Sequence, residues 1–121
     1  MRASLYNYRQ SPRKVRLVAS LIKGKSVTEA LSSLRVLVKK AGTPLEKLIR
    51  SSMANAEKNF GLDSKNLIVK SIRVDKGVTL KRSMPRARGS AFPINKRASN
   101  VTVILSEKIM KEKSKKLTPN P

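Results

Sequence analysis

The amino-acid sequence predicts an α+β fold, in which three amphipathic helices are followed by a pair of antiparallel strands. Apolar residues recur at helical spacing in three consecutive segments before Gly61, and β-branched residues dominate from Leu67 onward. The chain has 121 residues, which is enough for one modest core. Because it contains only two Phe, two Tyr and no Trp, that core must be aliphatic.

One globular domain is expected over residues 1–106, followed by a basic C-terminal tail over residues 107–121. The first ten residues have no strong pattern, but Leu5, Tyr6 and Tyr8 fit an extended edge strand. The tail is rich in lysine and ends in Thr-Pro-Asn-Pro, a composition that predicts a frayed, solvated segment.

The first helix is expected to begin after Ser11 and to stop at Gly24. Ser11 can cap the helix, and the following Pro12 suits the first helical position because its missing N–H group is not needed there. The apolar residues that recur along this helix are Val15, Leu17, Val18, Leu21 and Ile22.

The second helix is expected after Ser26, because Ser26 and Glu29 have the spacing of a capping box. Lys39 and Lys40 follow at a place where cations favour a helix C-terminus, and Gly42 is expected to break the helix. The apolar stripe of this helix comprises Ala30, Leu31, Leu34, Leu37 and Val38.

The third helix is expected to begin at Thr43, with Pro44 at the first helical position and Glu46 completing a second capping box. It is expected to end near Gly61. Small side chains in the middle of its inner face predict close packing against another backbone. That inner face comprises Leu45, Leu48, Ile49, Ser52 and Ala56.

Two segments rich in β-branched residues are expected to pair as antiparallel strands. The first covers residues 67–74, and residues 75–77 offer a turn or bulge before the strand resumes at 78–80. The second covers residues 100–105. Its alternating apolar positions are Val101, Val103 and Leu105.

Residues 81–97, between these strands, contain six basic residues and no acidic one. A loop of this length is usually functional or disordered. Ordering it would cost on the order of 15 to 30 kcal/mol, which its few apolar residues cannot offset, so a partner outside the chain is expected to hold it. Pro85 and Pro93 stiffen the segment and Gly89 permits a reversal, which favours an arm with a tip over a floppy solvated loop.

The charge balance predicts a polyanionic partner. The net charge of +21 comes from 28 Lys and Arg against seven acidic residues, so nucleic acid is the leading candidate. With no Cys, no His, no P-loop and no evident catalytic pair of acids, we expect no enzyme, no cofactor and no metal site. No apolar run is long enough for a signal peptide or a membrane span, and a cytoplasmic protein is expected.

Cations cluster at both ends of the first helix, with Arg13, Lys14 and Arg16 at its start and Lys23 and Lys25 at its end. The first helical turn is also expected to present free backbone N–H groups. A phosphate placed there would meet both the helix end and the basic side chains. RNA contact is therefore expected, and an ordinary solvated helix face is the alternative.

Two asparagines on the third helix are further candidates. Asn55 and Asn59 lie four residues apart and could hydrogen-bond bases or sugar hydroxyls of RNA. The alternative is that they are solvent-facing polar residues of the helix. For the lysines of the C-terminal tail, a solvated segment is the preferred interpretation.

Four motifs occur in order along the chain: Ser11-Pro12-Arg13-Lys14-Val15-Arg16-Leu17-Val18, Leu21-Ile22-Lys23-Gly24-Lys25, Ala54-Asn55-Ala56-Glu57-Lys58-Asn59 and Lys81-Arg82-Ser83-Met84-Pro85-Arg86-Ala87-Arg88-Gly89. Together they resemble the large-subunit ribosomal protein L twenty-two family over roughly residues 3–106. Four motifs in the same order distinguish this family from other basic proteins, which charge alone does not. The sequence departs from the family pattern at residues 90–93, where further charges are usual, and at Asn100, where His is common.

The resemblance implies three helices packed on a small three-stranded antiparallel sheet, with a long extended β-hairpin arm at about residues 78–99. It implies a structural constituent of the large ribosomal subunit that joins several domains of the large-subunit ribosomal RNA during assembly. Its other implied partners are neighbouring large-subunit ribosomal proteins and the nascent polypeptide, because the arm lines the exit tunnel. No membrane and no small-molecule substrate is implied.

By position, the resemblance assigns RNA contacts to the basic start of the first helix, to the two asparagines and to the arm. The contacts on the arm would be Lys81, Arg82, Arg86, Arg88, Lys96 and Arg97. The tip that lines the tunnel would comprise Arg86, Ala87, Arg88, Gly89, Ser90, Ala91 and Phe92. Compaction of DNA is the competing hypothesis, and a membrane-active peptide is disfavoured because the apolar stripes are needed for a core.

Overall fold

The computed structural model describes residues 2–107, so all of the predicted C-terminal tail except Glu107 lies outside the described residues. These residues form three helices and five strands, which confirms the predicted α+β class. In chain order the elements are β1 (Arg2–Tyr8), α1 (Pro12–Ile22), α2 (Val27–Val36), α3 (Gly42–Phe60), β2 (Leu67–Lys76), β3 (Leu80–Pro85), β4 (Ala91–Lys96) and β5 (Ser99–Glu107). Short 3₁₀ turns precede β2 and separate β3 from β4.

The main sheet has three strands in the order β1-β5-β2, and both pairings are antiparallel. The predicted edge strand at the N-terminus is therefore confirmed, and so is the antiparallel pairing of the two β-branched segments. The turn or bulge predicted at residues 75–77 corresponds to an interruption at residues 77–79, between β2 and β3, and no bulge forms at Asp75 or Lys76. Asp75 and Lys76 continue the ladder opposite Asn100 and Ser99, and the register shift lies between Val69 and Ser71.

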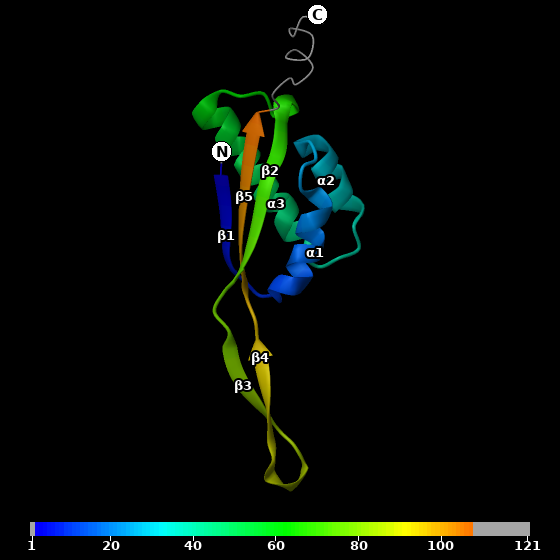
Figure 1. The fold of residues 1–121 in the computed structure, drawn as a ribbon, viewed down its shortest axis with the longest axis vertical. Helices are drawn as coiled ribbons and strands as arrows, with labels where there is room; N and C mark the ends of the chain where they lie inside the picture. Colours follow the sequence, from blue (N-terminus) through cyan, green and yellow to red (C-terminus); the bar gives the residue numbers. More distant parts are fainter. Residues whose placement is uncertain (1, 108–121) are drawn as a thin grey trace, which may run out of the picture.

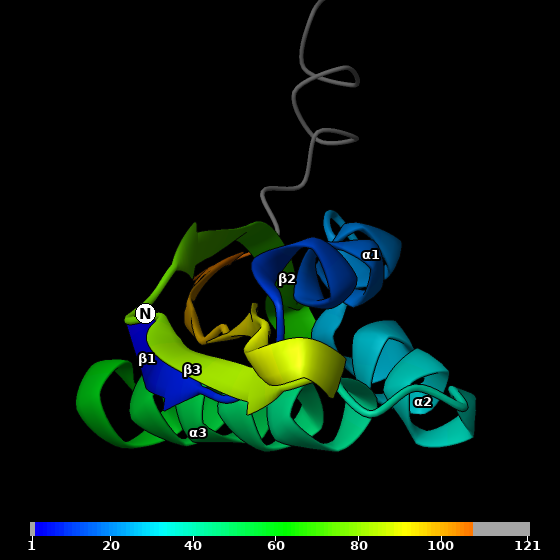
Figure 2. The same ribbon diagram turned by 90° about the horizontal axis from the view of Figure 1, so that it is seen from below.

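The helices cover one face of this sheet and one of its edges. In Figure 1, α3 lies behind β5, and α1 and α2 lie beside β2. Viewed from below, α3 runs along one side of the molecule with α1 and α2 next to each other (Figure 2). The core between these layers is aliphatic, as predicted. Its largest fully buried side chains are Val15, Ile22, Val27, Leu45, Ile49, Leu67, Val69, Val101, Val103 and Leu105.

Helix α1 follows the prediction on its inner face and differs from it in two respects. Val15, Val18 and Ile22 are buried, but Leu17 and Leu21 are exposed because each precedes an inward residue by one position, about 100° around the helix. Ser11 occupies the N-cap position, yet its side chain makes no capping hydrogen bond. The predicted hydroxyl cap is therefore wrong.

Helix α2 begins as predicted and ends early. The hydroxyl of Ser26 accepts a hydrogen bond from the backbone N–H of Glu29, at 3.4 Å. The backbone becomes extended at Leu37, which turns its partly buried side chain toward the core. Val38 is 94% exposed and does not belong to the apolar stripe, and the lysines at 39–40 lie beyond the helix.

Helix α3 begins two residues earlier than predicted, because Gly42 is its first residue and Ala41 its N-cap, where Pro44 and Thr43 were expected. The predicted capping box is therefore wrong, because Thr43 already lies inside the helix. Glu46 pairs instead with the guanidinium groups of Arg50 and Arg35, at 2.7 and 3.5 Å. The predicted inner face is buried, and the helix ends at Gly61 in the left-handed conformation, as expected.

Gly42 was expected to break the chain between two helices, but it is the first residue of α3, and the break lies at residues 37–41. A Cβ atom at this position would lie 3.3 Å from the backbone oxygen of Leu34. The end of α2 therefore packs closely against the start of α3, which only a glycine allows without a shift of the backbone. Packing between the two helices decides where α3 begins.

Strands β3 and β4 form a separate antiparallel hairpin. Their register runs without interruption from the pair Leu80 and Lys96 to the pair Pro85 and Ala91. In Figure 1 the hairpin extends from the end of β2 and the start of β5 away from the helices. All of residues 81–97 are exposed except Ile94, which is partly buried, and this confirms that the segment is not core.

Candidate nucleic-acid interface

Few cations of the described chain have an acidic partner. Within residues 2–107, ion pairs involve only Arg35, Arg50 and Arg73, whose partners are Glu46 and Asp75. All three arginine side chains are more than half exposed, so these pairs are weak in water. The remaining cations of this part of the chain are free to neutralise an external anion.

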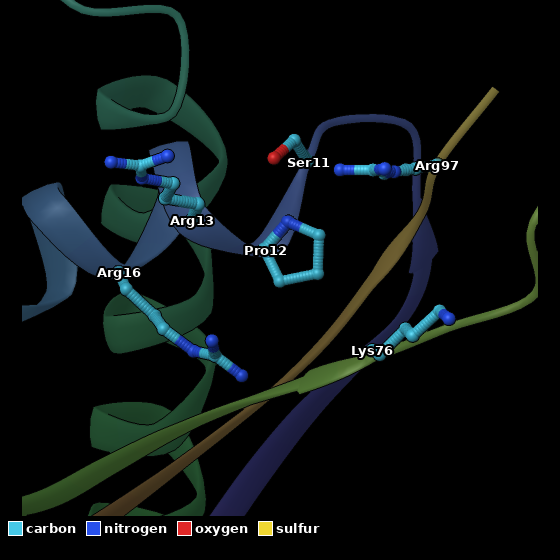
Figure 3. A pocket seen from close by; sticks show the side chains of 6 residues that line it. All are labelled: Ser11, Pro12, Arg13, Arg16, Lys76 and Arg97. Atoms are coloured by element: carbon cyan, nitrogen blue, oxygen red, sulfur yellow. The ribbon is translucent and has the colours of Figure 1, made fainter. Parts of the chain in front are cut away.

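Basic side chains from three separate segments line one open pocket of about 300 Å³ (Figure 3). The pocket lies between the start of α1, the end of β2 and the residues that lead from β4 into β5. Its lining residues are Ser11, Pro12, Arg13, Arg16, Lys76 and Arg97, and we call it the basic pocket. Four of these six residues are cationic and none is acidic, which suits a phosphate group.

The fold joins two predicted clusters in this pocket. Arg13 and Arg16 were predicted as the basic start of the first helix, and Arg97 as part of the arm. Lys76 was not predicted, because residues 75–77 were interpreted as a turn or bulge. Lys76 is identified as a pocket residue by the pairing of β2 with β5. This pairing places Lys76 opposite Ser99, at the same end of the sheet as Arg97.

Arg16 has a structural role as well as a charge. Its Nε and Nη2 atoms both donate hydrogen bonds to the carbonyl oxygen of Val74, at 3.2 and 3.0 Å. These bonds tie α1 to β2 and fix the guanidinium at the wall of the pocket. Figure 3 shows Arg16 pointing toward β2, while Arg97 points toward Ser11 from the opposite side.

The helix end contributes less to this site than expected. The backbone N–H groups of Lys14 and Val15 both donate to the carbonyl oxygen of Ser11, at 3.1 and 3.2 Å, and Pro12 has no N–H group. At most the N–H group of Arg13 remains free in this turn. The prediction of several free donors is therefore wrong, and side-chain cations account for the chemistry of the pocket.

The cations at the other end of α1 are not part of the basic pocket. Lys23 is exposed, and the ammonium group of Lys25 lies 3.5 Å from the hydroxyl of Ser33. Because α1 has 11 residues, they lie roughly 15 Å along the helix from Arg13. Any RNA contact they make would involve a different phosphate group.

The two asparagines of α3 differ in their surroundings. The side-chain amide of Asn55 donates a hydrogen bond to the carbonyl oxygen of Arg2, at 3.2 Å, and thereby holds β1 against α3. Asn59 is exposed one turn further along the helix. One donor of Asn55 thus has a structural role, and contact of either residue with RNA stays a prediction.

The remaining predicted cations lie on the hairpin, and their residues are exposed: Lys81, Arg82, Arg86, Arg88 and Lys96. At the tip, the backbone N–H of Arg86 donates to the carbonyl oxygen of Ser90 at 2.8 Å, and the hydroxyl of Ser90 donates to the carbonyl oxygen of Ala87 at 3.0 Å. Both Arg88 and Gly89 have a positive φ, of 62° and 69°. The reversal therefore involves two left-handed residues, of which only the glycine was expected.

No helix in residues 2–107 is both long enough and apolar enough to cross a membrane. Two further pockets lie at the edge of β1 and beside the start of α2. Among the lining residues of the first, one lysine is the only charged residue, and the second has one lysine and one glutamate. Neither one gathers cations as the basic pocket does.

Residues 3–106 match the family model described as Ribosomal protein L22p/L17e. The chain is also 49% identical over 106 residues to the protein named Large ribosomal subunit protein uL22 from Pediococcus pentosaceus. That alignment covers 88% of this chain and 90% of the relative. The family match extends from the first strand to the last and includes the hairpin.

Proposed function

Because this chain belongs to the ribosomal protein L22p/L17e family, it is a structural constituent of the large ribosomal subunit, and we propose that it binds large-subunit ribosomal RNA through the basic pocket and the hairpin. The observation that carries the proposal is the convergence of four cations from three chain segments, with no acidic residue among them. Such a pocket fits a phosphate group of a folded RNA.

The mechanism we propose is electrostatic and mechanical. Lys and Arg displace the counterions of phosphate groups, so binding weakens steeply as salt concentration rises. The globular part and the hairpin present cations at two places far apart in the molecule, and each would meet a different RNA segment. One protein would then join RNA domains that are distant in sequence, which stabilises their assembled arrangement.

We further propose that the hairpin is an arm whose tip, residues 86–92, lines the nascent polypeptide exit tunnel. Support comes from its exposed cations and from its extension beyond the helices (Figure 1). Its additional partners would be neighbouring large-subunit proteins and the nascent chain, and its location would be the cytoplasmic ribosome. No catalytic step belongs to this function, since the family is structural.

Binding to RNA is tested by measuring affinity for transcribed large-subunit ribosomal RNA over a series of salt concentrations. The double substitution Arg13→Ala and Arg97→Ala should weaken binding and reduce the salt slope by about two, roughly one for each arginine that no longer neutralises a phosphate group. Arg73→Ala is the matched control, because it also removes an arginine charge but one already paired with Asp75. An equal effect of both changes would contradict a specific role of the basic pocket.

Duplex DNA of equal length separates this proposal from compaction of DNA. A scaffold for folded RNA should prefer the ribosomal fragment, because its cations are placed to match an RNA fold. A protein that binds by charge alone should bind both polymers equally and lose affinity for both in parallel as salt rises. Equal affinities would favour the DNA-compacting alternative.

A further inference from the structure

The hairpin has two chemically different faces. Its strands pair without a bulge, so directly paired residues point to the same side and alternate along each strand. One side carries Leu80, Arg82, Met84, Phe92, Ile94 and Lys96, and we call it the apolar hairpin face. The other side carries Lys81, Ser83, Pro85, Ala91, Pro93 and Asn95. All the large apolar side chains of the hairpin strands are thus on one face, together with two of the cations.

The tip end of the apolar hairpin face is open to solvent. Met84 and Phe92 lie directly opposite each other and are 44% and 55% exposed. The guanidinium carbon of Arg86 lies 5.7 Å from the centre of the Phe92 ring, within the range of a cation–π contact. An exposed aromatic ring beside an exposed thioether and a cation offers a ligand an apolar surface and a charge at the same place.

The turn holds these side chains in place. The backbone bond from Arg86 to Ser90 closes the loop, and the Ser90 hydroxyl braces it through Ala87. Arg86 and Phe92 therefore flank a hydrogen-bonded turn and are not parts of a free chain. The backbone that carries the ring and the guanidinium group is therefore hydrogen-bonded without a ligand, which lowers the ordering cost of binding.

We infer that Phe92, with Met84 beside it and Arg86 over its ring, is a stacking site for an unpaired nucleobase of the large-subunit ribosomal RNA. The inference rests on the proposed RNA binding of the hairpin and names the group that its tip recognises. A nucleotide supplies both things the site needs, a flat base for the ring and a phosphate group for the cations. Residues 81–97 contain six cations and no acid, so a neutral peptide would leave these charges without partners.

Residues 90–93 carry no charge, and Phe92 is the only aromatic residue of the hairpin. Stacking on Phe92 would add attraction for RNA at a part of the tip that has no cation. Because every base has a flat face, this contact depends little on the identity of the base.

Base stacking and electrostatic attraction can be separated by the salt dependence of RNA binding, because only the electrostatic part weakens as salt rises. Phe92→Leu should weaken binding to transcribed large-subunit ribosomal RNA by about fivefold or more, while the salt slope stays that of the parent protein. Phe92→Trp should retain the affinity, since it keeps an aromatic face. Arg86→Ala should both weaken binding and reduce the salt slope by about one. Ser83→Ala, on the opposite face, is the matched control and should bind as the parent does.

A photocrosslink identifies the class of molecule on the ring. With benzoylphenylalanine in place of Phe92, illumination of assembled large subunits should join residue 92 to a ribosomal RNA nucleotide. A crosslink only to a protein or to the nascent chain would overturn the inference, and so would parental binding of Phe92→Leu. If Arg13→Ala with Arg97→Ala still weakens binding in that case, the proposed function survives and only the stacking site fails.

Discussion

The basic pocket and the hairpin tip are both cationic, but different forces hold their side chains in place. The pocket is lined by residues at the start of α1, at the end of β2 and just before β5, and nearby residues Val15, Val74 and Ser99 of these segments are buried. The tip has no buried residue and depends on a turn closed by two hydrogen bonds. Core packing therefore determines the geometry of the pocket, whereas hydrogen bonds within the turn determine the geometry of the tip.

This difference means that the two sites should respond to different substitutions. A change in the core should disturb the pocket and leave the hairpin turn unaffected, and a change in the turn should do the reverse. Local openings of a protein are nearly independent when few contacts connect the regions concerned. Two sets of substitutions test this independence, and a third tests how the pocket is anchored to the core.

The largest effect is expected from Ile22→Ala. Ile22 is fully buried, so its truncation should lower the free energy of unfolding by about 2 to 5 kcal/mol. Phe92→Ala removes a larger side chain, but one that is 55% exposed, and should change stability by less than about 0.5 kcal/mol. Urea unfolding followed by circular dichroism measures both values. Similar decreases for both variants would show that the hairpin and the core unfold as one unit.

An intermediate effect is expected from Arg16→Ala. It removes two hydrogen bonds to the carbonyl oxygen of Val74 and should cost about 1 kcal/mol of unfolding free energy. Arg97→Ala is the control, because it removes an equal charge from the same pocket with no such bonds to β2, and it should leave stability nearly unchanged. Arg16→Lys should also destabilise, since an ammonium group cannot reproduce the two-pronged contact. Equal stability of all three variants would mean that Arg16 does not anchor α1 to β2.

A smaller effect is expected from Gly89→Ala at the tip. A Cβ atom there would meet nothing within 4 Å, so the only penalty is the positive φ of 69°, about 1 kcal/mol for a residue with a side chain and confined to the hairpin. Hydrogen exchange at the amide of Arg86 should become roughly fivefold faster, while exchange in α1 should not change. Arg88→Gly should slow exchange at the same amide, because Arg88 already has a positive φ. Faster exchange in α1 would contradict the independence of the two regions.

The sequence predicted those parts of the fold that depend on local periodicity. The inner faces of α1 and α3 follow from apolar spacing, and the pairing of β2 with β5 follows from two β-branched runs. The end of α3 at Gly61 was predictable because a left-handed residue at that position favours glycine. Each of these features is encoded by residues close together in the chain.

The predictions that failed concern boundaries at which a distant segment intervenes. The start of α3 is fixed by the approach of Gly42 to the backbone of α2, and so the Thr43 cap never forms. The Glu46 carboxylate was assigned to that cap, and it pairs with arginines instead. Capping residues favour a helix boundary only weakly compared with tertiary packing. Packing can therefore shift the first or last residue of a helix by one or two positions.

The same division applies to the candidate site. The excess of cations, the basic start of the first helix and the exposed basic segment at residues 81–97 follow from the sequence alone, because charge and the shortage of apolar groups are properties of composition. The folded arrangement was needed to show that Arg13, Arg16, Lys76 and Arg97 line one pocket and that Phe92 lies opposite Met84. Packing of α1 on β2 brings Arg13 and Arg16 to the pocket, and strand register places Lys76 opposite Ser99 and Phe92 opposite Met84. Both depend on contacts between segments that are distant in the sequence.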